Sequence, residues 1–291
     1  ILDVTQSLAM LDRSADSGGA MTPIVITEAQ TEFVATQLAV SYENVVAFLA
    51  WDRQHPSSIR NCIESTRENA RAVRGSITSE MWENINDTWI AFQDKSRSIN
   101  PLLTGNEFFE WVKERSHLFR GITFATARRD QPYHFVRLGT FIERADNTAR
   151  ILNVKYADEA PDSFEETEVD KETDYYRLSA VLRSVSALEA YRDTYRDVID
   201  ARRVAEIMIF DAKLPRSLRY CMDEATNVID SLPVASSRIP RRIVAEINAK
   251  LRYGTIDEVL DYGLKRYLAD FLLDMVKLGS SVNAAYMETH V

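Results

Sequence analysis

The sequence predicts an all-α fold in which two tandem-duplicated helical units pack into one helical bundle, elongated or compact. Three observations lead to this prediction. The 291 residues include only 9 Gly and 8 Pro, about 3% each against an average usage of roughly 7% and 5%, so residues that interrupt helices are scarce. Apolar residues recur with a helical period, and no alternating strand pattern of useful length occurs. A stretch of the first half also reappears in the second half.

The repeat links residues 45–62, VVAFLAWDRQHPSSIRNC, with residues 204–221, VAEIMIFDAKLPRSLRYC. At a constant offset of 159 the shared residues are Asp52 and Asp211, Pro56 and Pro215, Ser58 and Ser217, Arg60 and Arg219, Cys62 and Cys221. Further on, Ile85-Asn86 matches Ile247-Asn248 at offset 162. We therefore expect a first helical repeat over residues 1–130, a second over 131–291, and residues 28–95 to superpose on residues 186–252.

Helical patterns can be followed in order along the chain. They cover residues 2–13, 28–53, 56–74, a segment after Thr78, then 106–127, 132–156, 172–198, 201–212, 215–231, 238–252 and 255–288. Residues 14–22 read as a loop because they contain Gly18 and Gly19. Ser58 and Thr78 are expected to cap the N-termini of the helices that follow them.

The helix expected over 132–156 has the clearest apolar seam, formed by Leu138, Ile142, Ala145, Ala149 and Leu152. Residues 157–173 follow it, with eight acidic residues against the single Lys171. We interpret this segment as a solvated, mobile linker between helices; an acidic binding arm is the alternative. In addition, residues 1–4 match residues 151–154 at offset 150, so about one helix is expected to precede Ile1.

Charge and composition exclude several classes of function. The net charge of −9 disfavours binding to nucleic acid, which requires Lys and Arg to displace counterions. No apolar run approaches the roughly 20 residues of a membrane span. Cys62 and Cys221 are far apart in sequence and are expected to be reduced thiols of a cytoplasmic protein. No zinc or di-iron spacing and no nucleotide-binding glycine loop occurs, so we expect no metal and no cofactor.

Four fragments together carry a family resemblance: FIERADNTARIL, HPSSIRNCIESTRENARAVR, SEMWENIN and FDAKLPRSLRYC. They resemble the alpha-E family, bacterial all-helical proteins named for a Glu-Arg motif. The resemblance implies a first Glu-Arg helix, which this chain does not show. It also implies two partners, a circularly permuted ATP-grasp ligase and a transglutaminase-like protein, and hence a role in peptide synthesis or modification.

Within FIERADNTAR, the residues Glu143, Asn147 and Arg150 share one helical stripe. In a functional interpretation Glu143, assisted by Asn147, is a catalytic base or an ammonium ligand, and Arg150 binds a carboxylate or phosphate. The alternative is a solvated helix face with weak pairs between neighbouring side chains. Arg144 lies on a different face, near Arg137 and beside Phe141, and is expected to bridge to another helix.

A second group of candidates borders the apolar seam of the 56–74 helix: Arg60, Arg67, Arg71 and Arg74. Partly buried guanidinium groups require anions, so these residues bind either a ligand carboxylate or neighbouring acidic side chains. Their counterparts in the second repeat are Arg219, Thr226, Asp230 and Pro233, so the duplicated architecture does not itself demand the arginines.

The favoured hypothesis is a helical accessory or co-catalytic partner of an ATP-grasp peptide ligase that binds a peptide or carboxylate. The alternatives are a stand-alone enzyme acting on a peptide or amide, and a structural scaffold without a ligand. An exposed Glu143 would favour the scaffold. We further expect Arg67, Arg71 and Glu143 to meet in one polar cleft between the two halves.

Overall fold

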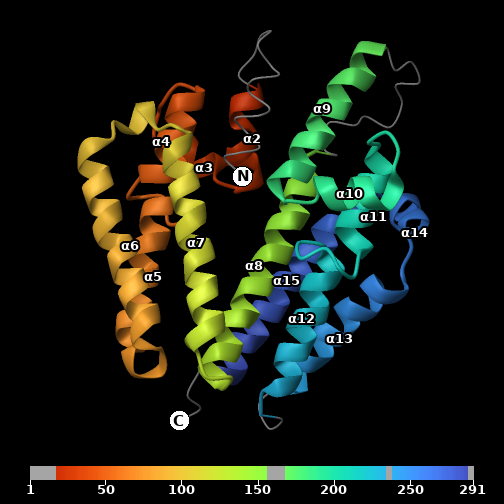
Figure 1. The fold of residues 1–291 in the computed structure, drawn as a ribbon. Helices are drawn as coiled ribbons and strands as arrows, with labels where there is room; N and C mark the ends of the chain where they lie inside the picture. The colour runs from red at the N-terminus through yellow and green to blue at the C-terminus, as the bar shows by residue number, and fades with distance from the viewer. Residues whose placement is uncertain (1–17, 156–167, 234–237, 288–291) are drawn as a thin grey trace. The chain divides into compact units, whose positions relative to one another are not determined.

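The computed structural model describes residues 18–155, 168–233 and 238–287, and these divide into two compact units. The first unit extends to Tyr133 and the second begins at His134, inside a helix. About 80% of the described residues are helical, in 14 α-helices, and none of them lies in a strand. The all-α prediction is therefore confirmed (Figure 1).

The first unit is built from six α-helices that precede the boundary helix α8 and from two short 3-10 turns. Their bounds are α2 (Gly18–Ile26), α3 (Gln30–Ala35), α4 (Tyr42–Trp51), α5 (Ile59–Ala72), η1 (Arg74–Ser76), α6 (Ser79–Ser98), η2 (Pro101–Leu103) and α7 (Asn106–Thr126). An aromatic cluster holds α4, α6 and α7 together. In it the Trp51 ring stacks on Phe92 and Phe108, with centroids 5.2 and 4.6 Å apart. The Trp51 indole N–H donates to the Thr104 hydroxyl at 2.8 Å, so its only polar group is satisfied.

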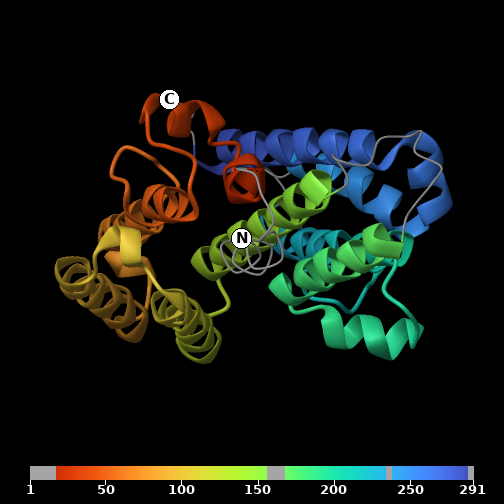
Figure 2. The same ribbon diagram turned by 90° about the horizontal axis from the view of Figure 1, so that it is seen from above.

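The second unit contains the remaining helices, with α8 crossing the boundary. Their bounds are α8 (Gln131–Lys155), α9 (Glu168–Ser184), α10 (Leu188–Tyr195), α11 (Ala201–Phe210), α12 (Leu218–Ser231), α13 (Arg238–Tyr253), α14 (Ile256–Tyr262) and α15 (Leu264–Tyr286). Helices α13 and α15 lie side by side in Figures 1 and 2. The core centres on α12, where Leu218, Met222 and Ile229 are fully buried.

Several predicted local features are confirmed. The predicted α8 seam is buried except for the half-buried Ile142. Ser58 and Thr78 cap α5 and α6, accepting hydrogen bonds from the backbone N–H groups of Asn61 and Met81 at 3.2 Å each. Each serine or threonine oxygen thereby satisfies an amide at a helix start that has no partner within the helix.

Several boundary predictions need correction. The helix predicted over 172–198 is divided at Ser186 (φ 55°) and the helix predicted over 255–288 at Gly263 (φ 94°), because both residues leave the helical conformation. Residues 18–22, predicted as loop, begin α2, because tertiary burial of Ile24 outweighs the low helix propensity of the two glycines. The single helix predicted over 28–53 is two helices, since Gln37 adopts φ 57° and Ser41 starts a new helix. Residues 168–173, assigned to the acidic linker, are helical in α9; the rest of that linker and the helix predicted over 2–13 lie outside the described residues.

The turns that lead into α5 and α12 have the same hydrogen-bond pattern. The Ser58 hydroxyl donates to the Asp52 carbonyl at 2.7 Å, and the Ser217 hydroxyl donates to the Asp211 carbonyl. Both serines are fully buried, and both following helices have 14 residues. The repeated sequence motif thus corresponds to a repeated local structure.

The correspondence extends to segments without sequence identity. Glu28 and Ser186, which are 158 positions apart, adopt φ 53° and 55°. Gln37 and Arg196, which are 159 positions apart, adopt φ 57° and 50°. Such left-handed conformations are uncommon for residues other than Gly, so their recurrence at the repeat offset is an independent local match. Superposition of residues 28–95 on 186–252 remains the direct test of duplication and stays a prediction.

Removing either capping serine is expected to destabilise the protein. Ser58→Ala and Ser217→Ala should each lower the free energy of unfolding by about 1–2 kcal/mol, because each leaves a helix amide without its acceptor and removes a hydrogen bond to the carbonyl of Asp52 or Asp211. Urea denaturation measures this loss. Ser65→Ala is the matched control, since Ser65 is exposed within α5. An equal loss in the control, or no loss at one of the two turns, would contradict the shared capping role.

Candidate functional site

The arginines of α5 are largely paired within the first unit. Arg67 donates to the Asn86 side-chain oxygen at 3.0 Å and forms an ion pair with Glu68 at 2.6 Å. Arg71, which is mostly exposed, approaches the same Glu68 at 3.4 Å. These contacts are the internal salt bridges that the sequence left open as the alternative to ligand binding.

Two members of this group differ from that pattern. The Arg74 guanidinium lies 5.7 Å from the Trp82 ring centroid and donates to the Ser79 hydroxyl at 3.4 Å. Arg60 is half-buried, and its Nε atom has no hydrogen-bond partner within the residues described. Arg60 is therefore the α5 arginine best placed to accept an external anion.

The Arg67–Asn86 contact has a counterpart in the second unit. Asn248 donates to the Thr226 hydroxyl at 2.8 Å, and these two residues occupy the repeat positions of Asn86 and Arg67. The first contact joins α5 to α6, and the second joins α12 to α13. This supports a structural role for Arg67 in joining helices, since Thr serves at the equivalent place.

The predicted polar stripe on α8 is also paired along its own helix. Asn147 donates to Glu143 at 3.0 Å, and Glu143 is exposed. Arg150 makes a two-point contact with Asp146 at 2.6 and 3.2 Å. The exposure of Glu143 favours a solvated helix face at this stripe, which is the outcome expected of the scaffold alternative. Glu143 and Arg67 belong to different units, so the shared cleft stays a prediction.

A different face of α8 contacts α12 and the turn before it. Arg137 forms an ion pair with Glu224, and the Phe141 ring meets the Tyr220 ring edge-on with centroids 6.2 Å apart. Two turns further along α8, the Thr148 hydroxyl donates to the Arg216 carbonyl at 2.9 Å. As the residue numbers rise along α8, the numbers of their partners on α12 and the preceding turn fall, so the two segments are antiparallel. We call this contact the α8–α12 seam.

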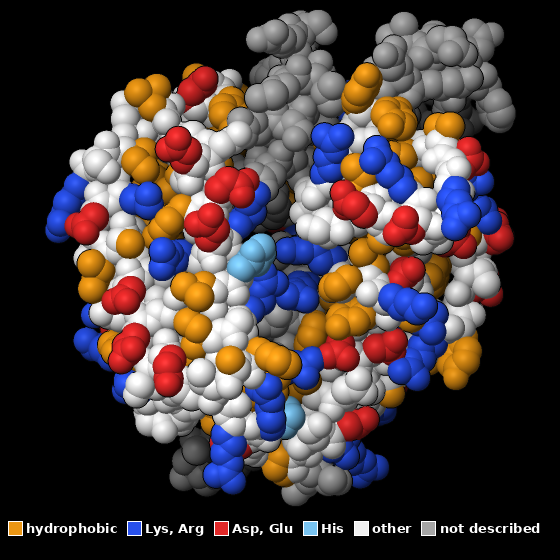
Figure 3. Space-filling view, in the orientation of Figure 1, with side chains coloured by type: hydrophobic (Ala, Val, Ile, Leu, Met, Phe, Trp, Pro, Cys, Tyr) orange, Lys and Arg blue, Asp and Glu red, His pale blue; other side chains and the backbone are white. Residues whose placement is uncertain are grey.

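Arg144 lies within the seam, between Phe141 and Thr148, with its guanidinium 5.7 Å from the Phe141 ring centroid. Burial lowers the pKa of the half-buried Arg216, and the positive charge of Arg144 lowers it further. Among the residues that the structure describes, no carboxylate forms an ion pair with either arginine. Two half-buried guanidinium groups of the seam therefore lack an ion-pair partner among the described residues, and the charge of one acts on the other. Figure 3 shows basic side chains gathered over α8.

This arrangement suits the binding of an anion. A carboxylate or phosphate offers paired oxygens that match the planar donor arrangement of a guanidinium group. Bringing two such groups together is unfavourable until an anion neutralises them. The sequence interpretation placed Arg144 correctly beside Phe141 and missed Arg216. A difference between the two repeats could have pointed to Arg216. The matched position in the first repeat is Ser57, so the duplicated architecture does not require an arginine there.

Burial keeps two titratable side chains, Cys221 and His55, in their neutral forms. Burial raises the pKa of the Cys221 thiol to about 12, even though Arg144 and Arg216 act to lower it. Cys221 is therefore a protonated thiol at neutral pH and a poor nucleophile. His55 is buried against the Phe48 ring, with centroids 4.5 Å apart, and burial lowers its pKa. Both side chains act as core residues.

The described ranges contain neither a metal-ligand cluster nor a membrane-spanning helix. Within them, no group of three or more His, Cys, Asp or Glu side chains is placed to hold a metal ion. None of the helices there combines the length and the apolar character that crossing a membrane requires. The expectation of no metal and no cofactor stays a prediction.

Comparison with known proteins places the chain in a sequence family. The model of the family Alpha-E, described as a predicted alpha-helical domain with a conserved ER motif, matches residues 1–287. Uncharacterized proteins of Mycobacterium bovis and of two Mycobacterium tuberculosis strains are 24% identical over 232 residues, which is 77% of this chain. That region is 25% of each relative, so the chain spans about a quarter of their length. No solved structure matches.

Proposed function

Because this chain belongs to the Alpha-E family, we propose that it is a helical accessory partner of a peptide-bond-forming ATP-grasp ligase. In this proposal the chain binds a carboxylate group of the peptide. The observation that carries the proposal is the pair Arg144 and Arg216 in the α8–α12 seam, which lacks a carboxylate partner among the described side chains. Arg144 is the arginine of the FIER sequence, which resembles the Glu-Arg motif for which the family is named.

The partner follows from the family resemblance. Proteins resembling this one are associated with circularly permuted ATP-grasp ligases and transglutaminase-like proteins, whose reactions involve peptide carboxyl and amide groups. The Mycobacterium relatives have about three quarters of their length outside the matched region, which supports a function that combines an Alpha-E region with other domains. A cytoplasmic location belongs to the same proposal.

The candidate residues divide into three groups under this proposal. Arg144 and Arg216 bind the carboxylate, and Arg60, with its unpartnered Nε, offers a second anion contact in the first unit. Arg67, Arg71, Arg74 and Arg150 mainly stabilise helices through the contacts described above. Tandem duplication of the helical unit is part of the proposal, and the matching turns and left-handed residues support it.

Copurification with the ATP-grasp ligase expected beside its gene tests the proposed function. We expect the two proteins to elute together, and the ligase to form its peptide product at least about tenfold faster with the chain present, as for an added positioning partner. Mass spectrometry of the product measures the effect. Serum albumin at equal concentration controls for nonspecific stabilisation of the ligase. Equal product formation with and without the chain, together with separate elution, would refute the accessory role.

A further inference from the structure

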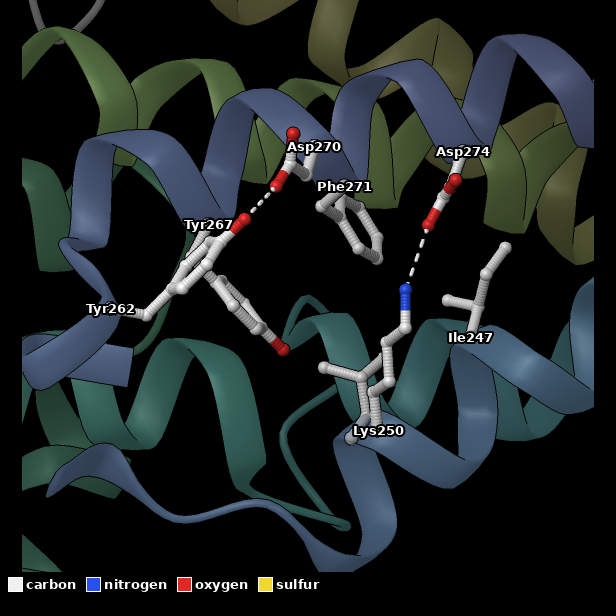
Figure 4. Close-up of a pocket in the computed structure, with 8 residues that line it drawn as sticks. Ile247, Lys250, Tyr262, Tyr267, Asp270, Phe271 and Asp274 are labelled. Carbon is white, nitrogen blue, oxygen red and sulfur yellow. Dashed lines mark hydrogen bonds and ion pairs between the residues drawn. The ribbon is translucent and has the colours of Figure 1, made fainter. Parts of the chain in front are cut away.

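A groove in the second unit is distant in sequence from the arginines of the α8–α12 seam. Two adjoining hollows of about 250 and 380 Å³ lie between α13, α14 and α15. Both are lined by Lys250, Tyr262 and Tyr267, so they form one continuous groove. Figure 4 shows the part of it that lies between α13 and α15.

The walls of this groove are unusually aromatic. Phe210, Tyr253, Tyr262 and Tyr267 line the larger hollow, and Phe271 lines the smaller one. Tyr253 is 82% exposed and Tyr262 is 45% exposed, although large aromatic side chains usually bury most of their surface. Aromatic faces left open around a hollow offer a surface that attracts positive charge.

One further carboxylate lines each hollow, Asp270 the smaller one and Glu258 the larger one. Asp270 accepts a hydrogen bond from the Tyr262 hydroxyl at 2.7 Å, and Glu258 accepts one from the Thr255 backbone N–H at 2.9 Å. Neither carboxylate forms an ion pair with any basic side chain of the described residues. The groove therefore has two carboxylates that form no ion pair within the described residues.

The cations nearest the groove have other partners. Lys250 pairs with Asp274 at 3.2 Å, and Lys277 pairs with the other oxygen of Asp274 at 3.0 Å. Burial acts to raise the pKa of Asp274, but the hydrogen bonds from the two lysines outweigh it and the net shift is downward. Arg266 lies over the Tyr262 ring, 4.6 Å from its centroid, which shows a cation already attracted to one of these aromatic faces.

Tyr267 supplies the remaining polar contact. Its hydroxyl has no hydrogen-bond partner within the described part of the chain, and burial raises its pKa to about 12. It is therefore a neutral hydroxyl that can accept a hydrogen bond from a donor in the groove. In Figure 4 the Tyr267 ring lies beside Tyr262, which reaches Asp270, while the Lys250–Asp274 pair lies at the other end.

We propose that this groove binds the ammonium group of an alkyl primary amine, such as the side chain of lysine. The aromatic faces and the two carboxylates without ion-pair partners attract the charge. The Tyr267 hydroxyl oxygen accepts a hydrogen bond from an ammonium N–H, and Ile247 and Leu251 contact the alkyl chain. A hydrated metal ion fits less well, because aromatic walls provide no ligands for it. The inference does not depend on the proposed partnership with a ligase.

Calorimetric titration of the full chain with cadaverine tests the inference, with pentanol as an uncharged probe of similar length. We expect cadaverine to bind with a dissociation constant in the range of about 0.1–1 mM, and pentanol to bind at least about tenfold more weakly because it lacks the charge. Asp270→Asn should weaken cadaverine binding about tenfold while keeping an oxygen that accepts from Tyr262. Tyr267→Phe, which removes only the hydroxyl, should weaken it about threefold.

The control variant is Asp261→Asn, which removes an exposed carboxylate of α14 outside the groove. It should leave cadaverine binding unchanged. Three results would each overturn the inference: no heat of binding with cadaverine at ten times the expected dissociation constant, equal affinity for pentanol, or equal weakening by Asp261→Asn and Asp270→Asn. A far-UV circular dichroism spectrum of each variant confirms that the chain is folded.

Discussion

Replacing Arg144 and Arg216 together by glutamine is expected to lower ligase-coupled product formation by about 100-fold, since two charge-assisted contacts to the substrate carboxylate are lost. Thermal stability should stay the same or rise. The positive charge of Arg144 acts unfavourably on the half-buried Arg216, so removing both charges relieves this interaction. Product formation in the reconstituted ligase reaction and the melting temperature measure the two effects separately.

Two further variants sharpen this test. Arg192→Gln removes an exposed arginine of α10 and should leave product formation unchanged. Arg216→Glu should also abolish carboxylate binding, but it places a carboxylate beside Arg144 and should raise the melting temperature by forming the absent ion pair. If the double glutamine variant kept full activity, or if Arg216→Glu supported product formation, the seam would not be the anion site.

The two cysteines are expected to react with a thiol reagent at rates that differ by at least about 1000-fold. Cys62 is exposed on α5, whereas Cys221 is fully buried on α12 and its thiol has a pKa of about 12. At pH 7 about one Cys221 side chain in 100,000 is a thiolate, and reagent reaches it only when the second unit opens. Mass spectrometry of protein treated with iodoacetamide over time measures both rates.

The pH dependence of Cys221 labelling separates two causes of its slow reaction, namely the protonation of the thiol and its burial in the second unit. Raising the pH from 7 to 9 increases the Cys221 thiolate fraction about 100-fold, but the fraction stays near one in 1000 because the pKa is about 12. Labelling should become complete only in urea that unfolds the chain. A Cys62→Ser variant serves as the control, since its labelling then reports on Cys221 alone. Rapid labelling of this variant in the folded protein would contradict the burial of Cys221.

Features that depend on neighbours in sequence could be predicted without a structure. The α8 seam follows from the spacing of its apolar side chains, and the caps at Ser58 and Thr78 follow from residue types that bind free amides at helix starts. Boundaries were less predictable. Gln37 and Ser186 are residues that helices tolerate, and nothing in their chemistry requires the left-handed conformations that end helices there.

The candidate sites divide in the same way. Helical spacing correctly placed Glu143 and Asn147 on one stripe, where they hydrogen-bond, and placed Arg144 on a separate face beside Phe141. Helical spacing could not decide whether the α5 arginines would bind an external anion or pair with side chains of the protein itself. The answer for Arg67 depends on Asn86, which belongs to a different helix and reaches it only through the packing of α5 on α6.

The sequence by itself determined the all-α fold class, the α8 seam, the helix caps and family membership, because each depends on composition, local spacing or local motifs. Only the tertiary structure decided that Arg216 lies beside Arg144 and that tyrosines and carboxylates line one groove. A helical period defines which side chains share a face, but not which other helix covers that face or in what register. Contacts such as Thr148 with Arg216 arise from that register, which is set by burial of the whole α12 face.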